Sequence, residues 1–243
     1  MKKEESIQRE RAKSRDHKRV GAELDFLSRE AYNLLRTNLS FALPDKEGGK
    51  IIGVTSSNPQ EGKSFTSINL AYSLAEAGHR VILIDADMRR PSVNAVLETP
   101  GAPGLSNMLS GGDDACIHKG VLHEGLSVLF SGDIPPNPAE LIGSARMKKL
   151  LATLAGQYDY VIVDLPPVNC VSDPLAISGG LDGIVMVLRH RKTRRAEVRE
   201  AVNQLQYAGI RILGIVYNGY TRSSGVYARR GGKYYGSYGA TER

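Results

Sequence analysis

The chain has 243 residues, of which 41% are hydrophobic and 24% charged, a composition typical of a soluble globular protein. It has two cysteines, too few for a disulfide framework, and neither an apolar run long enough for a membrane span nor a signal peptide, so we expect a reducing cytoplasm. The net charge is +6, and the excess lies at the two ends. Such ends favour nucleic acid, anionic lipid or an acidic partner, but solvated tails explain them equally well.

Residues 1–22 have few apolar side chains, and we expect a flexible basic leader there. An amphipathic helix is predicted over residues 24–41, where apolar side chains recur at helical spacing. Pro44 and the Gly48-Gly49 pair end this pattern.

From residue 50 onward, short apolar stretches alternate with helical ones. Strands are predicted over 50–55, 81–85, 126–130, 159–164, 183–188 and 210–216, and helices over 63–77, 138–155 and 193–208. This alternation predicts an α/β fold in which a mostly parallel central sheet carries helices on both faces. Ligands bind beyond the carboxyl ends of such strands, where the loops after residues 54, 84 and 163 would converge.

The first of these loops has the order of a phosphate-binding loop: an apolar strand, the polar residues 55–61, then Gly62-Lys63-Ser64 at the start of a helix. Its backbone N–H groups would face nucleotide phosphates, Lys63 would reach the β- and γ-phosphates, and the Ser64 hydroxyl would sit on Mg²⁺. Ser57 stands where the pattern normally has its first glycine. A lone Gly-Lys-Ser also begins ordinary helices, so the loop needs support from elsewhere in the chain.

That support comes from acids at the ends of two other predicted strands. Asp85 and Asp87 follow residues 81–84, and Asp164 follows residues 160–163. A buried carboxylate needs a partner or a cation, and Asp87 and Asp164 could hold Mg²⁺ together with Ser64. Asp85 could orient or deprotonate an attacking hydroxyl. The alternative is that these acids cap helices or form ion pairs.

The C-terminal residues 220–243 form a separate zone, rich in glycine and without a periodic apolar face, which we expect to be disordered. It holds five of the eleven tyrosines. Three interpretations remain open: an aromatic low-complexity segment, a stacking surface for single-stranded nucleic acid, or a set of hydroxyls for modification.

Together these motifs resemble the Walker A, A′ and B set of the bacterial tyrosine kinases of capsule and exopolysaccharide export, whose P-loop fold is shared with the MinD/ParA ATPases. The matching stretches are residues 57–64, 81–89 and 161–167. Residues 30–38 are similar to the Glu-x-x-Arg-x-x-Arg helix with which the family assembles into rings, with Asn33 in place of the first arginine. The tyrosine-rich end is similar to the family's autophosphorylation tail.

The resemblance implies an ATP- and Mg²⁺-dependent protein tyrosine kinase that phosphorylates its own tail and regulates capsule or exopolysaccharide synthesis and export. It implies three catalytic residues, Lys63, Asp85 and Asp87, and a metal site of Ser64, Asp87 and Asp164. Nucleotide contacts are expected from Ser57, Gln60, Glu61, Gly62, Lys63, Ser64 and Phe65, and from Asn218 at the adenine base. The expected phosphoacceptors are Tyr227, Tyr234, Tyr235 and Tyr238, and the expected self-association residues are Glu30 and Arg36.

The resemblance also implies partners and a location. These are the cytoplasmic segment of a separate transmembrane activator or polysaccharide co-polymerase, further copies of the chain in an unphosphorylated ring, a tyrosine phosphatase and protein tyrosine substrates, with no specific nucleic acid. The protein would be cytoplasmic and peripheral at the inner face of the membrane. We expect a leader at 1–22, a kinase domain at 23–219 and a tail at 220–243.

The alternative function is a MinD/ParA-like nucleotide-switched ATPase that binds DNA or membrane. Those ATPases carry a second lysine in the phosphate loop, and no lysine occurs between Ile51 and Gly62. The tyrosine cluster also has no use in such a protein, so both features favour the kinase.

Overall fold

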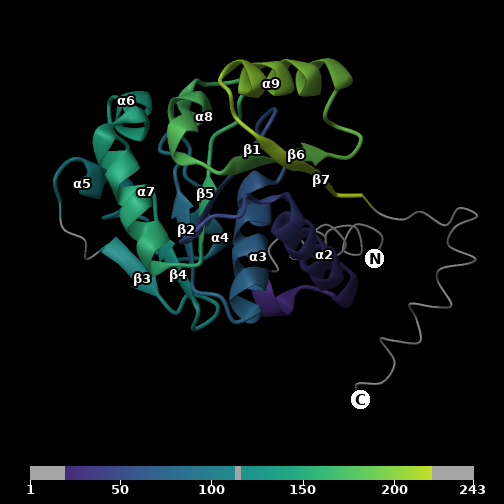
Figure 1. Ribbon diagram of the computed structural model, residues 1–243, viewed down its shortest axis with the longest axis horizontal. Helices are drawn as coiled ribbons and strands as arrows, with labels where there is room; N and C mark the ends of the chain where they lie inside the picture. The colour runs from purple at the N-terminus through teal and green to yellow at the C-terminus, as the bar shows by residue number, and fades with distance from the viewer. Residues whose placement is uncertain (1–19, 113–115, 221–243) are drawn as a thin grey trace, which may run out of the picture.

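The computed structural model describes residues 20–112 and 116–220, and Figure 1 shows a central sheet with helices packed around it. The seven strands are β1 (Lys50–Ser56), β2 (Val81–Asp85), β3 (Ile117–Lys119), β4 (Leu126–Leu129), β5 (Tyr160–Asp164), β6 (Gly183–Arg189) and β7 (Ile212–Asn218). Their order across the sheet is β3-β4-β2-β5-β1-β6-β7. Only β3 runs antiparallel to its neighbour, and the other pairs are parallel.

Helices cover both faces of this sheet. They are α2 (Phe26–Ala42), α3 (Lys63–Glu76), α4 (Val93–Val96), α5 (Leu105–Leu109), α6 (Pro138–Gly143), α7 (Ala145–Gln157), α8 (Asp173–Ala176) and α9 (Arg195–Tyr207), with short 3₁₀ turns at Gly21–Glu23 and Ser178–Gly180. One face packs against α3, α4 and part of α2, and the other against α5, α6, α7 and α9. Within the described residues, no helix combines the length and hydropathy that a membrane span requires.

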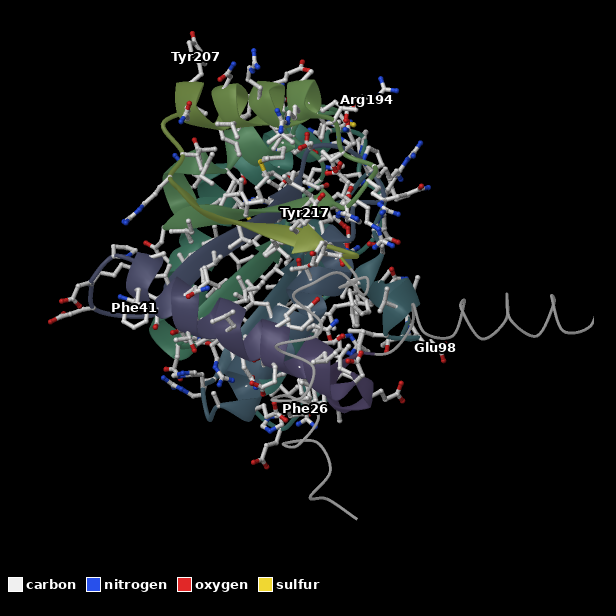
Figure 2. The ribbon with its side chains drawn as sticks, turned by 90° about the vertical axis from the view of Figure 1, so that its right-hand side faces the viewer. Phe26, Phe41, Glu98, Arg194, Tyr207 and Tyr217 are labelled. Atoms are coloured by element: carbon white, nitrogen blue, oxygen red, sulfur yellow. The ribbon has the colours of Figure 1, made fainter. Side chains whose placement is uncertain are left out.

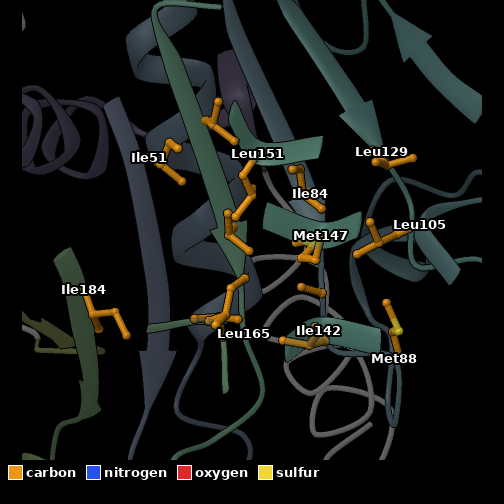
Figure 3. Close-up of a cluster of buried hydrophobic side chains, with 14 of the residues drawn as sticks. Ile51, Ile84, Met88, Leu105, Leu129, Ile142, Met147, Leu151, Leu165 and Ile184 are labelled. Atoms are coloured by element: carbon orange, nitrogen blue, oxygen red, sulfur yellow. The ribbon is translucent and has the colours of Figure 1, made fainter. Parts of the chain in front are cut away.

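The two buried faces explain why the strands are apolar throughout. In β2, Val81 and Leu83 point into the cluster under α3, while Ile82 and Ile84 point into the cluster under α6 and α7. Figure 3 shows this second cluster, where Met147 of α7 lies between Ile84 of β2 and Ile142 of α6. Burying a side chain of this size stabilises the fold by about 1.5–3 kcal/mol, so both sheet faces contribute to the core.

Helix α2 precedes the first strand, so it is not part of the alternating strands and helices, and it packs on α3. Asp25 caps its start by accepting from the Ser28 amide over 3.0 Å, and the chain turns extended at Leu43, just before Pro44. The inner side buries Leu39, while the outer side exposes 68% of Leu27, 61% of Leu34 and 84% of Phe41. Figure 2 shows α2 across the front of the molecule, with Phe26 and Phe41 at its two ends.

The structure confirms the α/β prediction, with the six predicted strands shifted by at most two residues at their ends. The prediction of one helix over 138–155 is wrong, because Ser144 adopts an extended conformation and caps a second helix by accepting from the Met147 amide. Strand β3 and the short helices α4, α5 and α8 were not predicted. The expected leader and tail fall outside the described residues, except Val20 to Ala22 and Tyr220.

Candidate functional site

The strand order brings the predicted loops to one edge of the sheet. Strand β5 lies between β2 and β1, so Asp164 is the register partner of Asp85 on one side and of Val54 on the other. The loop after β5 is tied to the loop after β1, since Val168 donates to the Ser56 carbonyl over 2.9 Å and Thr55 donates to the Pro166 carbonyl over 2.7 Å. Residues far apart in the sequence therefore form one site.

The phosphate loop between β1 and α3 has an unusual backbone. Gln60 and Gly62 both have positive φ, at 63° and 94°. A Cβ on Gly62 would lie 1.9 Å from the Asn218 side-chain nitrogen, so only glycine fits there. The first turn of α3 leaves its amides without intrahelical partners, as a phosphate-binding loop requires.

Glu61 holds this loop from within. It is 1% exposed, and its carboxylate accepts from the Asn58 amide over 3.1 Å and from the Thr193 hydroxyl. Its backbone carbonyl accepts from the Asn218 side-chain amide over 3.0 Å. Glu61 and Asn218, both expected to contact the nucleotide, thus also fix the loop to the end of β7.

The centre of the site is a cluster of one ammonium, one hydroxyl and two carboxylates. Lys63 Nζ lies 2.9 Å from an Asp87 oxygen and 3.2 Å from an Asp164 oxygen. The Ser64 hydroxyl donates to Asp164. Burial alone would lower the pKa of Lys63, but the charges of Asp164 and Asp87 outweigh it and raise that pKa above its usual value. Lys63 is therefore a permanent cation.

Asp85 and Asp87 have different surroundings although they are two residues apart. Asp85 is fully buried, and its oxygens accept from the backbone amides of Asp87, Ser92 and Val93 over 3.1–3.2 Å. Burial and the nearby charge of Asp164 raise the pKa of Asp85 to about 7. Asp87 instead faces Lys63. Asp85 thus shapes the loop that presents Asp87.

Ser57 does not have a positive φ, so the backbone at this position does not require the glycine that phosphate loops normally have there. The residue is fully buried, and its hydroxyl has no hydrogen-bond partner among the described residues. A buried, unsatisfied hydroxyl in a phosphate loop is a group that a ligand could satisfy.

Two hollows border the loop. A cavity of about 620 Å³ is lined by Lys63, Ser64 and Asp87 on one wall and by Pro166 and Pro167 on another. A groove of about 1010 Å³ runs from the loop past Asn218 and Tyr217 to α2. Phe65 and the loop residues Gln60 and Gly62 line both hollows. Sites of this size are large enough for a small-molecule cofactor.

The donors in this cluster fit a nucleotide with Mg²⁺. Two carboxylates, those of Asp87 and Asp164, flank the single ammonium of Lys63, and hard carboxylate and hydroxyl oxygens are the ligands Mg²⁺ prefers. The described residues contain no group of three or more His, Cys, Asp or Glu side chains arranged to hold a metal. An ion here would accordingly be held by Ser64 and one or two carboxylates together with phosphate oxygens.

Glu30 and Arg36, the residues expected to mediate self-association, point in different directions. Glu30 is exposed and accepts from the Asn33 side-chain amide over 3.0 Å. Arg36 points inward instead, where its guanidinium donates to the backbone carbonyl and hydroxyl of Ser73 in α3. The expected phosphoacceptors Tyr227, Tyr234, Tyr235 and Tyr238 lie outside the described residues.

Sequence reasoning missed four residues of this site. Ser67 donates to Asp164 over 2.9 Å, Ser92 donates to Ser64 over 2.7 Å, and the buried Asp173 pairs with Arg89. The fourth is Thr193 beneath Glu61. Only Ser67 had a signal, because it lies one helical turn after Ser64 on the same helix.

Comparison with known proteins gives consistent results. Residues 48–225 match the ParA family model, described as NUBPL iron-transfer P-loop NTPase. The tyrosine-protein kinase CpsD of Streptococcus agalactiae is 37% identical over 219 residues, which cover 88% of this chain and 91% of CpsD. The kinase domain of the Escherichia coli tyrosine kinase Etk is 35% identical with a TM-score of 0.76, over 82% of this chain and 78% of that one.

Relatives differ in length. The alignments with two Ralstonia EpsB proteins cover 88% and 87% of this chain but only 29% of each EpsB. Those relatives are therefore much longer than the region they share with this chain.

Proposed function

Since the chain belongs to the bacterial tyrosine kinases, we propose that it transfers the γ-phosphoryl group of ATP to protein tyrosines, among them Tyr227, Tyr234, Tyr235 and Tyr238 of its own C-terminal segment. The observation that carries this proposal is the position of Lys63, which lies between Asp87 and Asp164 at the wall of a cavity that opens beside the phosphate loop. A cation fixed at this position would stabilise the negative charge of the phosphoryl group during its transfer.

When bound, ATP·Mg²⁺ supplies the phosphoryl group and part of the positive charge that stabilises it. Ser64 and Asp164 are the proposed metal ligands, together with Asp87. Ser57, Gln60, Glu61, Gly62 and Phe65 would surround the phosphates, and Asn218 would orient the base. Lys63 stays charged throughout, because the two carboxylates beside it raise its pKa.

Asp87 is the carboxylate that we place nearest to the acceptor hydroxyl, because it lines the cavity. This assignment departs from the one expected from the sequence, which gave that place to Asp85. The Asp85 carboxylate is engaged by three backbone amides, so we propose that it positions Asp87. Pro166, Pro167 and Val171 line the same cavity and would pack against the acceptor ring.

The same family membership supports three further proposals. The protein serves capsule or exopolysaccharide synthesis and export, it is activated at the inner face of the membrane by the cytoplasmic segment of a transmembrane partner, and a tyrosine phosphatase resets it. Residues 1–22 and 220–243 act as leader and phosphoacceptor tail around a kinase domain at 23–219. Self-association would use the outer face of α2, where Glu30 and three apolar side chains are exposed.

A phosphotransfer assay on the full chain tests the proposed function. Phosphatase-treated protein is incubated with ATP and Mg²⁺, alone and with the activator's cytoplasmic segment, and phosphotyrosine is located by mass spectrometry. We expect phosphate on the C-terminal tyrosines, its loss in Lys63→Met, and its retention in the control Lys149→Met, which changes an exposed lysine on α7. ADP production without phosphotyrosine, with the activator present, would refute the kinase and support a nucleotide-switched ATPase.

A further inference from the structure

A cluster of cations lies beside the phosphate loop, at the start of α9. Its members are the exposed residues Arg191, Lys192, Arg194, Arg195 and Arg199, which we call the basic corner. Arg191 has a positive φ of 57°, in a tight turn where Lys192 and Thr193 both donate to the Arg189 carbonyl. The turn places several like charges close together on the surface.

These charges are not neutralised within the described part of the chain. The ion pairs found there involve other cations, namely Arg29, Lys46, Lys63, Arg80 and Arg89. The nearest acid in sequence, Glu197, is used to cap α9 by accepting from the Arg194 amide over 2.8 Å. Glu200 also lies on α9 and is exposed. Repulsion among unpaired cations makes this surface a favourable site for an anion.

The last described strand, β7, ends beside His190, the residue that immediately precedes the basic corner in the sequence. His190 donates from its backbone to the Asn218 carbonyl over 2.8 Å, and its ring lies 5.2 Å from the rings of both Tyr217 and Tyr220. Gly219 makes this turn possible, because it has a φ of 71° and a Cβ on it would meet the Arg189 guanidinium at 2.9 Å. In Figure 2, Arg194 lies at the end of α9 on the same side as the arrowhead of β7, with Tyr207 at the other end. Residues 221–243 therefore continue from a point beside the basic corner.

We propose that the basic corner binds the chain's own C-terminal segment once its tyrosines are phosphorylated. This inference rests on the proposed autophosphorylation. Arginine guanidinium groups recognise phosphate through paired hydrogen bonds, and four of the five cations are arginines. The site would thus hold the product of the reaction next to the site that made it.

Charge makes this binding specific for the phosphorylated form. Residues 221–243 contain five Lys/Arg and one Glu, a side-chain charge of 5 − 1 = +4, which the basic corner repels. Each phosphotyrosine adds about −1.5 to −2, so four of them add roughly −6 to −8 and bring the segment to about −2 to −4. Phosphorylation thereby changes repulsion into attraction.

The C-terminal segment is also long enough for its tyrosines to reach the basic corner. Tyr227 lies seven positions after Tyr220, and an extended chain spans up to roughly 3.3–3.6 Å per residue, or about 24 Å in total. Arg194 and Arg199 lie five positions apart, on the order of 8 Å along the helix axis. Tyr227 and the tyrosines after it can accordingly lie over the basic corner of the same chain.

A binding experiment tests this without any need for kinase activity. Fluorescent peptides of residues 224–241, either unphosphorylated or phosphorylated on Tyr227, Tyr234, Tyr235 and Tyr238, are titrated with phosphatase-treated full chain in the absence of ATP. We expect the phosphorylated peptide to bind at least tenfold more tightly, and this preference to weaken as salt is raised. Failure here, together with phosphotyrosine in the kinase assay, would refute only this inference.

Two triple variants locate the site. In Arg191→Ser/Arg194→Ser/Arg195→Ser we expect at least a tenfold loss of affinity for the phosphorylated peptide. The matched control Lys148→Ser/Lys149→Ser/Arg211→Ser removes the same charge from exposed positions on α7 and before β7, and should bind within twofold of wild type. Equal losses in both variants, or equal binding of the two peptides, would overturn the proposal. So would a result in which phosphatidylserine vesicles, and not the peptide, distinguish the two variants, because the basic corner would then be a membrane contact.

Discussion

The side-chain amide of Asn218 donates to the backbone carbonyl of Glu61 over 3.0 Å and so joins the end of β7 to the phosphate loop. Substitution of the adjacent Gly62 tests how much the loop depends on this contact. Gly62→Ala would place a Cβ 1.9 Å from the Asn218 amide nitrogen. We expect it to weaken ATP·Mg²⁺ binding more than tenfold, measured by calorimetric titration, because Asn218 and the loop must move apart.

Gly78→Ala is the matched control for this prediction. Gly78 also has a positive φ, of 88°, but a Cβ there would meet nothing within 4 Å. Both variants should lose about 1–2 kcal/mol of stability from the left-handed backbone, and only Gly62→Ala should lose nucleotide affinity. Similar affinities in the two variants would show that the Asn218 contact is dispensable.

Ser67 supports Asp164 from behind, with its hydroxyl donating to the carboxylate over 2.9 Å. Removing such a partner from a metal-binding carboxylate typically lowers metal affinity by about 10–100-fold. We therefore expect Ser67→Ala to require at least tenfold more Mg²⁺ for half-maximal nucleotide binding. The control is Ser131→Ala, because the buried Ser131 hydroxyl has no partner among the described residues. Equal Mg²⁺ requirements in the two variants would exclude this role for Ser67.

Asp25 makes the stability of α2 depend on pH. The hydrogen bond from the Ser28 hydroxyl, followed by backbone amides, holds the pKa of Asp25 below its usual value. A carboxyl whose folded pKa is lowered stabilises the protein above its unfolded pKa of about 3.9, and this contribution is lost as pH falls through the folded pKa.

We therefore expect Asp25→Ala to cost about 1 kcal/mol at pH 7, with the difference from wild type shrinking toward pH 3 in chemical denaturation. Asp45→Ala serves as control, since Asp45 is exposed and accepts no hydrogen bond within the described residues. A difference that stays constant over this range would contradict the capping role.

The outer face of α2 offers a test of self-association. Leu27, Leu34 and Phe41 are all exposed and seven residues apart, so they form a stripe along the helix. We expect Leu34→Glu to dissociate the proposed unphosphorylated assembly in sedimentation velocity experiments. Ile134→Glu, which changes another residue of similar exposure at 69%, should leave the assembly intact.

Arg36→Ala separates the stripe from the arginine motif. Because Arg36 is bound to Ser73 of the same chain, this variant should lower stability and leave assembly largely unchanged. Dissociation by Arg36→Ala and not by Leu34→Glu would assign the contact to the arginine.

Local patterns in the sequence predicted most of the fold and the centre of the site. The apolar runs predicted the six longer strands, and the acids at their ends predicted that Asp87 and Asp164 would meet Lys63 and Ser64. Pattern alone could not predict β3, whose three residues are too few for a periodicity, or the break at Ser144, where a cap residue interrupts a continuous apolar pattern.

The sequence also could not predict which side chains from distant segments would contact each other. The sequence could not show that Asp85 turns to the amides of Ser92 and Val93, because that contact depends on the path of the loop after Asp87. Thr193 and Asp173 were missed for the same reason. Each approaches the site from a segment whose neighbours are decided by the strand order.

The parallel direction of β7 fixes where the C-terminal segment begins. Strands β1, β6 and β7 point the same way, so residue 219 leaves the sheet at the edge that carries the phosphate loop. A segment tethered this close has an effective concentration on the order of millimolar. A free tyrosine peptide at micromolar concentration would hardly compete with it. If the proposed kinase activity holds, we expect efficient phosphorylation of foreign substrates only when they dock on their own or when the chain's own tyrosines are already occupied.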